Sequence, residues 1–281
     1  MKKCITFALC LIMAASLCAC SQTGAPTAAT TTAAADSAAT TAADASSQST
    51  LEAIKARGEL IVGVEATFPP FESFDPNDGT TIVGFDIDVM AEVAKDLGVK
   101  LTVKDMEFSG IVPSVQTGKI DIAPGITPTE ERKEIVDFSN EYCASKLGVV
   151  VREDDDSIQT VEDLKTKNVA AQLGSLADKQ LTAVLGTSPK GYNKHDEAIL
   201  AVKNGVIDAH VLDGSVGNNY AATMGGLKVI EIPELNEGVD GLACIARKGD
   251  TEMIEAINAT IKRLEDSGEM DKLMTKWNIF K

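Results

Sequence analysis

The chain has few of the residues that metal sites and nucleic-acid sites need. Its 281 residues include two histidines, His195 and His210, so a site built from several histidines is excluded. Lysine and arginine number 26 against 42 aspartates and glutamates, which argues against a nucleic-acid partner because phosphate binding needs concentrated positive charge. Mean hydropathy is +0.03, too low for repeated membrane spans. We expect no metal, no cofactor and no nucleic acid.

The first 19 residues are typical of a signal for export. Lys2 and Lys3 precede an apolar stretch over 5–19, which is too short to span a bilayer by the usual length rule. The stretch ends in Leu17-Cys18-Ala19-Cys20, which resembles a bacterial lipobox. The resemblance implies cleavage after residue 19 and a diacylglyceryl group on Cys20. The alternative is an ordinary signal peptide with incidental cysteines.

Residues 20–50 are expected to form a lipidated cysteine followed by a disordered tether. Positions 21–50 contain 11 alanines, 8 threonines and 5 serines, with no aromatic residue and no aliphatic residue larger than alanine. Such a segment cannot bury enough surface to offset the entropy of ordering. Its root-mean-square span is roughly 30 Å, enough to hold a folded domain away from a membrane.

Only Cys143 and Cys244 remain for the folded part, because the other four cysteines lie within the first 20 residues. In an exported protein these two could pair. They could equally be two small buried hydrophobic residues. We favour two free thiols.

From residue 51 onward the sequence alternates short apolar runs with amphipathic stretches. The first half suggests strands separated by helices, and therefore a parallel sheet covered on both faces. The pattern starts again near residue 146, which indicates two α/β lobes with a ligand cleft between them. Expected strands cover 60–64, 99–103, 120–123, 146–152, 168–172, 206–212 and 241–247, and the clearest expected helices cover 86–97, 176–185, 196–204, 252–266 and 269–277.

An ordered set of short motifs gives the sequence its specificity. It comprises the runs at 68–72 (FPPFE), 84–89 (GFDIDV), 108–121 (FSGIVPSVQTGKID), 125–133 (GITPTEERK) and 136–139 (VDFS). In this order and spacing the chain resembles the bacterial extracellular solute-binding proteins of family 3, the polar amino-acid receptors of ATP-binding-cassette (ABC) importers. The resemblance covers about residues 51–281. It implies a type II periplasmic-binding-protein fold, with one lobe from 51–145 and 240–281 and the other from 146–239, joined by hinge strands near 144–149 and 237–241.

The resemblance implies a site for the carboxylate of a free amino acid. Arg132 occupies the motif position that grips this group in the family, and a guanidinium provides paired donors in the required geometry. Thr127 offers a hydroxyl and Gly125 a backbone approach. Ser175, at an expected helix N-terminus, adds amides and a hydroxyl suited to an anion. Without the family match, Arg132 could equally be a surface residue.

Further positions are expected to hold the ammonium and the side chain of the ligand. Asp213 follows an expected strand where the family places the acid that binds the ammonium, although it could also be a simple cap. Phe68 and Phe108 match positions whose rings sandwich the ligand side chain, and the loop around Pro69 and Pro70 is expected to display its aromatics. Glu65 and Gln172 match positions near the end of that side chain, and Glu65 could favour a cation.

The sequence departs from the family in one place. The segment 122–125 (IAPG) is about one residue shorter than usual, and Pro124 removes a backbone donor there. The departure affects how the backbone near Gly125 would meet a ligand.

These features predict a monomeric, lipid-anchored receptor on the extracytoplasmic face of the cell membrane. It would capture a polar or charged amino acid by cleft closure and deliver it to the transmembrane subunits of an ABC permease, without enzyme activity. One alternative is an enzyme like cyclohexadienyl dehydratase, which shares the fold. Another is a ligand-sensing module.

Overall fold

The computed structural model describes residues 49–239 and 241–279. The expected signal segment, the lipidation site Cys20 and the tether up to residue 48 lie outside the described residues. Helix α1 (Thr50–Arg57) is capped by the Ser49 side chain, which accepts a hydrogen bond from the amide of Glu52. The first helix therefore begins at Thr50, one residue before the expected start of the folded part at residue 51.

The first sheet has five strands in the order β5-β1-β6-β13-β7. Strands β5 (Lys100–Asp105) and β6 (Ile122–Ile126) run parallel to β1 (Glu59–Val64). Strand β13 (Ala243–Arg247), from the end of the chain, lies between β6 and β7 (Val136–Phe138) and is antiparallel to both. The strands of the first half are parallel to one another, as expected, and the late strand β13 adds antiparallel pairs to the sheet.

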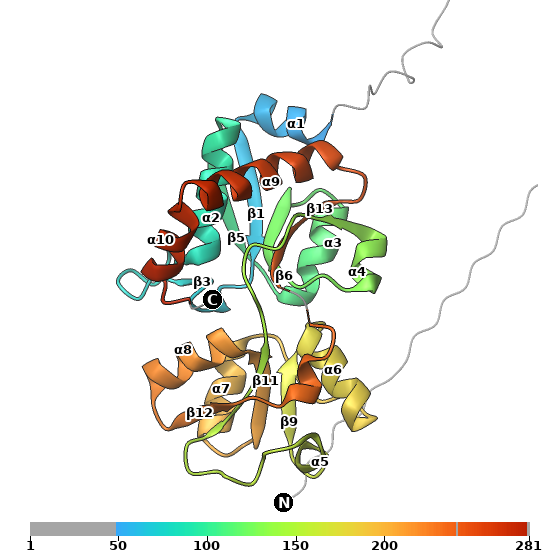
Figure 1. The fold of residues 1–281 in the computed structure, drawn as a ribbon, viewed down its shortest axis with the longest axis vertical. Helices are drawn as coiled ribbons and strands as arrows, with labels where there is room; N and C mark the ends of the chain where they lie inside the picture. Colours follow the sequence, from blue (N-terminus) through green and yellow to red (C-terminus); the bar gives the residue numbers. More distant parts are fainter. Residues whose placement is uncertain (1–48, 240, 280–281) are drawn as a thin grey trace, which may run out of the picture. The chain divides into compact units, whose positions relative to one another are not determined.

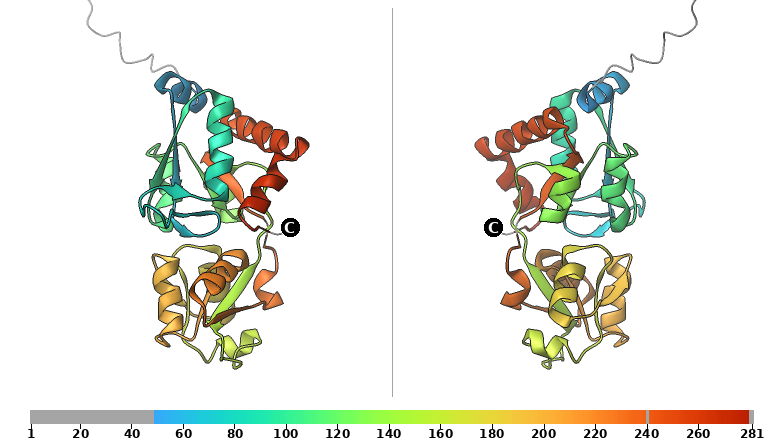
Figure 2. Two further views of the ribbon diagram at one scale, coloured as in Figure 1. Left: turned by 90° about the vertical axis from the view of Figure 1, so that its left-hand side faces the viewer. Right: turned by 90° about the vertical axis from the view of Figure 1, so that its right-hand side faces the viewer.

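The alternation of residues along β1 explains the layers on this sheet. Leu60 and Val62 are fully buried in a cluster with residues of α2 (Phe85–Leu97) and α9 (Thr251–Asp266). Ile61 packs on the opposite side, with residues of α3 (Ile111–Gln116). Figures 1 and 2 show α2 and α9 on one face of the sheet and α3 on the other. The remaining helices beside this sheet are α4 (Glu130–Ile135), α10 (Glu269–Lys276) and the 3-10 turn η1 (Phe108–Gly110).

The second sheet also has five strands, in the order β10-β9-β11-β8-β12. Strand β9 (Val169–Gln172) is parallel to β10 (Lys190–Tyr192) and β11 (Ala209–Asp213), whereas β8 (Leu147–Arg152) is antiparallel to β11 and β12 (Leu227–Ile230). Its helices are α5 (Val161–Leu164), α6 (Leu176–Leu185), α7 (His195–Lys203), α8 (Gly214–Met224) and the 3-10 turn η2 (Pro233–Asn236). We call the first sheet with its helices the first lobe, and the second sheet with its helices the second lobe.

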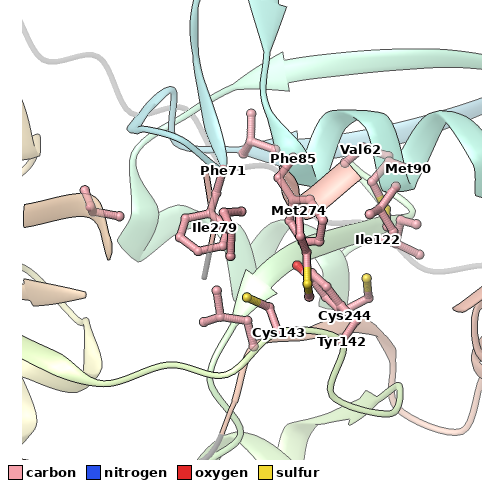
Figure 3. Close-up of a cluster of buried hydrophobic side chains, with 14 of the residues drawn as sticks. Val62, Phe71, Phe85, Met90, Ile122, Tyr142, Cys143, Cys244, Met274 and Ile279 are labelled. Atoms are coloured by element: carbon pink, nitrogen blue, oxygen red, sulfur yellow. The ribbon is translucent and has the colours of Figure 1, made fainter. Parts of the chain in front are cut away.

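A small antiparallel sheet of β2 (Thr67–Phe68), β3 (Glu72–Phe74) and β4 (Ile82–Val83) connects β1 to α2. The loop between β2 and β3 does not display both of its aromatics. Phe68 is half-buried, but Phe71 is fully buried and packs its ring 6.2 Å from that of Phe85. Figure 3 shows both rings within the core cluster. The expectation of an exposed aromatic pair was therefore wrong for Phe71, which the chain uses for packing.

Two segments pass between the lobes, and an isolated antiparallel bridge between Cys143 and Leu242 joins them. Cys143 and Cys244 are both buried and unpaired, as favoured from the sequence (Figure 3). Within residues 49–239 and 241–279, no helix combines the length and the apolar character that a membrane crossing requires.

Candidate functional site

A cavity lies where residues of the two lobes meet. The first lobe contributes the residues that follow β1 and β6, and the second lobe contributes the ends of β9 and β11 and the start of α6. All nine residues expected to form a ligand site line this one cavity: Glu65, Phe68, Phe108, Gly125, Thr127, Arg132, Gln172, Ser175 and Asp213.

Arg132 lines the part of the cavity next to Phe108 and Gly174. The hydroxyl of Thr129, the N-cap of α4, accepts a hydrogen bond from the amide of Arg132 at 3.2 Å and fixes its place in the first turn. The guanidinium donates from Nη1 to the carbonyl of Thr127 at 2.8 Å and from Nη2 to the carbonyl of Gly174 at 3.0 Å. Its carbon Cζ lies 5.5 Å from the centre of the Phe108 ring, close enough for a cation–π interaction.

The guanidinium remains charged at neutral pH. Burial lowers the pKa of Arg132 to about 10, still well above 7. Two of its five N–H donors are used by carbonyls, and the others remain for an anion. Across the cavity, Ser175 caps α6 by accepting a hydrogen bond from the amide of Asp178 at 3.2 Å. A positive side chain and a helix N-terminus therefore meet in the lining of the cavity, a combination that suits a carboxylate.

Asp213 is a helix cap that also lines the cavity. It is the N-cap of α8, where Oδ1 accepts hydrogen bonds from the amides of Ser215 at 2.8 Å and Val216 at 3.3 Å. Its other oxygen, Oδ2, accepts a 2.7 Å hydrogen bond from the Ser145 hydroxyl. Burial raises the pKa of Asp213, and the side chain is 5% exposed. Capping holds the carboxylate at the wall of the cavity.

The carboxyl groups of Glu72, which lines the cavity, and Asp86 are buried next to each other. The Tyr142 hydroxyl donates to Oδ1 of Asp86 at 2.9 Å and accepts from the amide of Gly125 at 2.8 Å. Oδ2 of Asp86 and Oε2 of Glu72 accept no hydrogen bond from a donor group among the described residues, and the two carboxyl groups interact with each other instead. Burial raises the pKa of Asp86 to about 6, and burial together with the nearby Asp86 raises that of Glu72 well above its usual range.

The hydrogen bond to Tyr142 determines which backbone groups near Pro124 are left to contact a ligand. Pro124 lies within β6 and lines the cavity, and Gly125 has φ +71°. A Cβ at Gly125 would lie 2.8 Å from Oδ2 of Asp86, so the position has no room for a side chain. Because the Gly125 amide is directed to Tyr142, only the carbonyl of this residue remains for a ligand.

Glu65 and Gln172 contact each other in the lining of the same cavity. Nε2 of Gln172 donates to Oε2 of Glu65 at 3.0 Å, and the Thr67 hydroxyl lies 2.8 Å from both carboxyl oxygens. Glu65 is only 2% exposed, and burial raises its pKa to about 7. A carboxyl in this state gains most from a cationic partner, which would compensate its desolvation.

Sequence reasoning missed four polar residues of this region: Glu72, Ser145, His195 and Tyr142. The first three line the cavity, and the fourth holds the Gly125 amide. Glu72 is the last residue of the motif at 68–72, so the sequence could have indicated it as a site residue. The others depend on contacts between distant segments. Within the described ranges, no group of three or more histidine, cysteine, aspartate or glutamate side chains is arranged to hold a metal ion.

The chain is similar in sequence to curated amino-acid-binding proteins. The arginine-binding extracellular protein ArtP of Bacillus subtilis is 33% identical over 223 residues, covering 78% of this chain and 86% of the relative. The L-cystine-binding protein TcyJ of Escherichia coli is 30% identical over 230 residues, covering 81% and 85%.

Solved structures extend the comparison to the fold. An amino-acid ABC transporter substrate-binding protein from Streptococcus pneumoniae, bound to L-arginine, matches with a TM-score of 0.77 and 34% identity, covering 82% of this chain and 97% of that one. The ancestral amino-acid-binding protein AncCDT-1, a precursor of cyclohexadienyl dehydratase, matches at 0.74 and 36%, covering 82% and 99%. The fold is therefore that of the type II periplasmic amino-acid-binding proteins, with two α/β lobes around a cleft. The family model of the bacterial extracellular solute-binding proteins, family 3, matches residues 60–280, and the chain belongs to this family.

Proposed function

We propose that the protein is the lipid-anchored receptor of an ABC importer for a cationic amino acid, with arginine as the first candidate. The observation that carries the proposal is the polarity of the cavity. Arg132, Asp213 and Glu65 line one cavity, in which Arg132 would bind the ligand carboxylate and Asp213 the α-ammonium. The buried Glu65 carboxyl would bind a cationic side chain, which would restore the charge balance. The arginine-binding relatives support the same choice.

Cleft closure is the mechanism that we propose for capture. Several hydrogen bonds cross from one lobe to the other. Nδ2 of Asn193 donates to Oε1 of Glu107 at 3.0 Å, and the Tyr220 hydroxyl donates to the carbonyl of Thr67 at 2.8 Å. With 51–145 and 240–281 moving as one body and 146–239 as the other, closure would break and form these bonds together. It would also exclude water and strengthen the charged contacts inside.

A thermal-shift screen of the common amino acids, followed by calorimetry, tests the proposal. Arginine at 100 times its dissociation constant should add about 2.7 kcal/mol to the free energy of unfolding. A micromolar dissociation constant corresponds to about -8 kcal/mol of binding free energy. Absence of any shift at millimolar amino acid would overturn the binding function. A shift with another amino acid, but none with arginine, would overturn only the ligand assignment.

The proposed anchor has a test of its own, which uses two neighbouring cysteines. In a bacterial host, Cys20→Ser should release the processed protein from the membrane, and labelled fatty acid should no longer be incorporated. The matched variant Cys18→Ser should leave both attachment and labelling unchanged. Equal labelling of the two variants would contradict the assignment of Cys20.

We propose binding without turnover, in contrast to a dehydratase. The likeness to AncCDT-1 makes the cyclohexadienyl acids the substrates to test. Incubation with prephenate or arogenate should leave both compounds unchanged. Elimination of water from either one, at a rate proportional to protein concentration, would favour the enzyme.

A further inference from the structure

The second lobe contains a pair of histidines that the proposed contacts do not use. His195 begins α7 and is 3% exposed, and His210 lies in β11 and is fully buried. Nδ1 of His195 lies 3.0 Å from Nε2 of His210. The other ring nitrogen of His210, Nδ1, lies 3.2 Å from the carbonyl oxygen of Ala170. The three groups form a single chain from the sheet to the cavity.

The chemistry of the groups determines where the protons lie. A carbonyl oxygen only accepts hydrogen bonds, so Nδ1 of His210 carries a proton and donates to Ala170. In a neutral ring the second nitrogen then holds a lone pair, and Nε2 of His210 is an acceptor. Nδ1 of His195 must therefore be the donor between the two rings. By the same rule, Nε2 of His195 keeps a lone pair.

Both rings are neutral in this environment. Burial lowers the pKa of His210 to about 4, and burial together with the neighbouring ring lowers that of His195 well below its usual value. The assignment does not depend on closure of the cleft, because Ala170, His195 and His210 all belong to the second lobe. The open protein and the closed protein should therefore have the same tautomers.

Nε2 of His195 is the last atom of the hydrogen-bonded series that runs from Ala170 through His210, and it remains for a ligand. The residue lines the cavity together with Glu65 and Gln172, and its ring lies 5.6 Å from that of Phe68. Among the described residues, no hydrogen bond reaches Nε2 of His195, whereas its backbone amide donates to the Thr67 hydroxyl at 3.0 Å. The lining of the cavity thus offers a second acceptor in addition to the Glu65 carboxyl.

We propose that His195 is a specificity-determining residue, whose Nε2 accepts a hydrogen bond from the ligand side chain and is held in that role by His210 and Ala170. The inference rests on the proposed amino-acid binding and narrows its substrate class. Two acceptors favour a group with several N–H donors in one plane, and a guanidinium provides five. An alkyl side chain would leave both acceptors buried without partners, and an acidic one would add repulsion.

The tautomers can be measured without any ligand. His195 and His210 are the only histidines of the chain, so protein labelled with ¹⁵N-histidine and purified without a histidine tag shows two imidazole rings. Spectra correlating ring carbon-bound protons with ring nitrogens distinguish protonated from bare nitrogens. At pH 7 both rings should carry their proton on Nδ1, and the His195→Phe variant assigns the remaining set to His210. A proton on Nε2 of His195 would overturn the proposal.

Binding measurements complete the test. The His195→Phe variant keeps a ring against Phe68 but lacks the acceptor, so we expect its arginine affinity to fall about 10- to 100-fold. Its affinity for norleucine, which has no side-chain donor, should not fall. In the wild-type protein, arginine should also shift the Nε2 resonance of His195. If wild type binds arginine and the variant retains affinity within threefold, the role of His195 is refuted while the proposed function stands. If wild type binds no amino acid, both are refuted.

Discussion

Nη2 of Arg132 donates a 3.0 Å hydrogen bond to the carbonyl oxygen of Gly174, a residue of the opposite lobe. The same guanidinium contacts the Phe108 ring and the Thr127 carbonyl. One side chain therefore belongs both to the proposed ligand site and to the contact between the lobes. Its removal should affect capture more strongly than the fold.

We expect Arg132→Ala to abolish binding of every amino acid, with a loss of at least about 100-fold, because the ligand carboxylate would be left in the cavity without its partner. Arg132→Lys keeps the charge but loses the paired donors, so an intermediate loss of about tenfold or more is expected. Isothermal calorimetry measures both. The neighbouring Lys133→Ala is the matched control and should bind as wild type. Affinity of Arg132→Ala within threefold of wild type would contradict the assigned role.

Binding of a cationic amino acid should depend on pH through Glu65. Burial raises its pKa to about 7, although the hydrogen bonds from Thr67 and Gln172 act in the opposite direction. A cation favours the ionised carboxyl, so binding at pH 7 should release about half a proton. The affinity should therefore rise about tenfold between pH 6 and pH 8.

Calorimetry in two buffers with different ionisation enthalpies measures this proton release. Glu65→Gln should abolish the release and flatten the dependence on pH, because the amide does not titrate. The same raised pKa has a consequence for stability. The folded state holds the Glu65 proton more tightly than the unfolded state, so this group's contribution to stability is lost as pH rises from about 4.5 to 7. Proton uptake on binding of arginine would contradict the account.

The carboxyl pair of Glu72 and Asp86 should limit stability at neutral and alkaline pH. The folded-state pKa of Asp86 is raised to about 6, so its contribution to stability is lost as pH rises from about 4 through 6. Asp86→Asn removes that titration and can still accept the hydrogen bond from Tyr142. The loss of unfolding free energy between pH 5 and pH 8 should be about 1 kcal/mol smaller in this variant.

Urea unfolding at the two pH values measures the effect. The exposed Glu255→Gln, which also removes one carboxylate, is the matched control and should follow the wild-type dependence on pH. If Asp86→Asn and Glu255→Gln give the same difference between pH 5 and pH 8, the buried pair is not responsible.

Two glycines with positive φ provide a test of how closely the backbone segments pack. A Cβ at Gly84, which has φ +151°, would lie 1.9 Å from the carbonyl oxygen of Phe71, whereas one at Gly79, with φ +67°, would meet nothing within 4 Å. Gly79→Ala should therefore cost only the backbone penalty of about 1 kcal/mol. Gly84→Ala should cost more than about 4 kcal/mol, because backbone atoms must move. Urea midpoints compare the two, and equal losses would contradict the crowding at Gly84.

The sequence predicted well those elements whose own residues determine them. The amphipathic stretch at 252–266 lies within α9, and 176–185 coincides with α6. Thr160 and Asp163, a threonine followed three residues later by an acid, form a capping box at the start of α5, and this spacing is visible in the sequence itself. In each case the periodicity or the cap lies within one short segment, so no distant contact is needed to recognise it.

Other features depend on contacts that a single segment does not reveal. Helix α8 (Gly214–Met224) was missed because its two glycines and two asparagines favour turns, and it forms behind the Asp213 cap. The strand expected at 120–123 instead covers Ile122–Ile126, where pairing with β13 extends it through Pro124 and Gly125. The nine expected site residues do meet in one cavity, but the partners of Asp213, Gly125 and Arg132 came only from the three-dimensional arrangement.

The position of β13 between β6 and β7 sets an order for the completion of the two sheets during synthesis. The second sheet has all its strands once residue 230 has been made. The first strand of the first sheet is made some 90 residues before the first strand of the second sheet, yet the first sheet is completed later. The inner edges of β6 and β7 stay unpaired until residues 243–247 follow. A product that stops before residue 243 would therefore have a complete second sheet and an incomplete first sheet. The unpaired edges of β6 and β7 would be exposed in this product, and exposed strand edges promote aggregation.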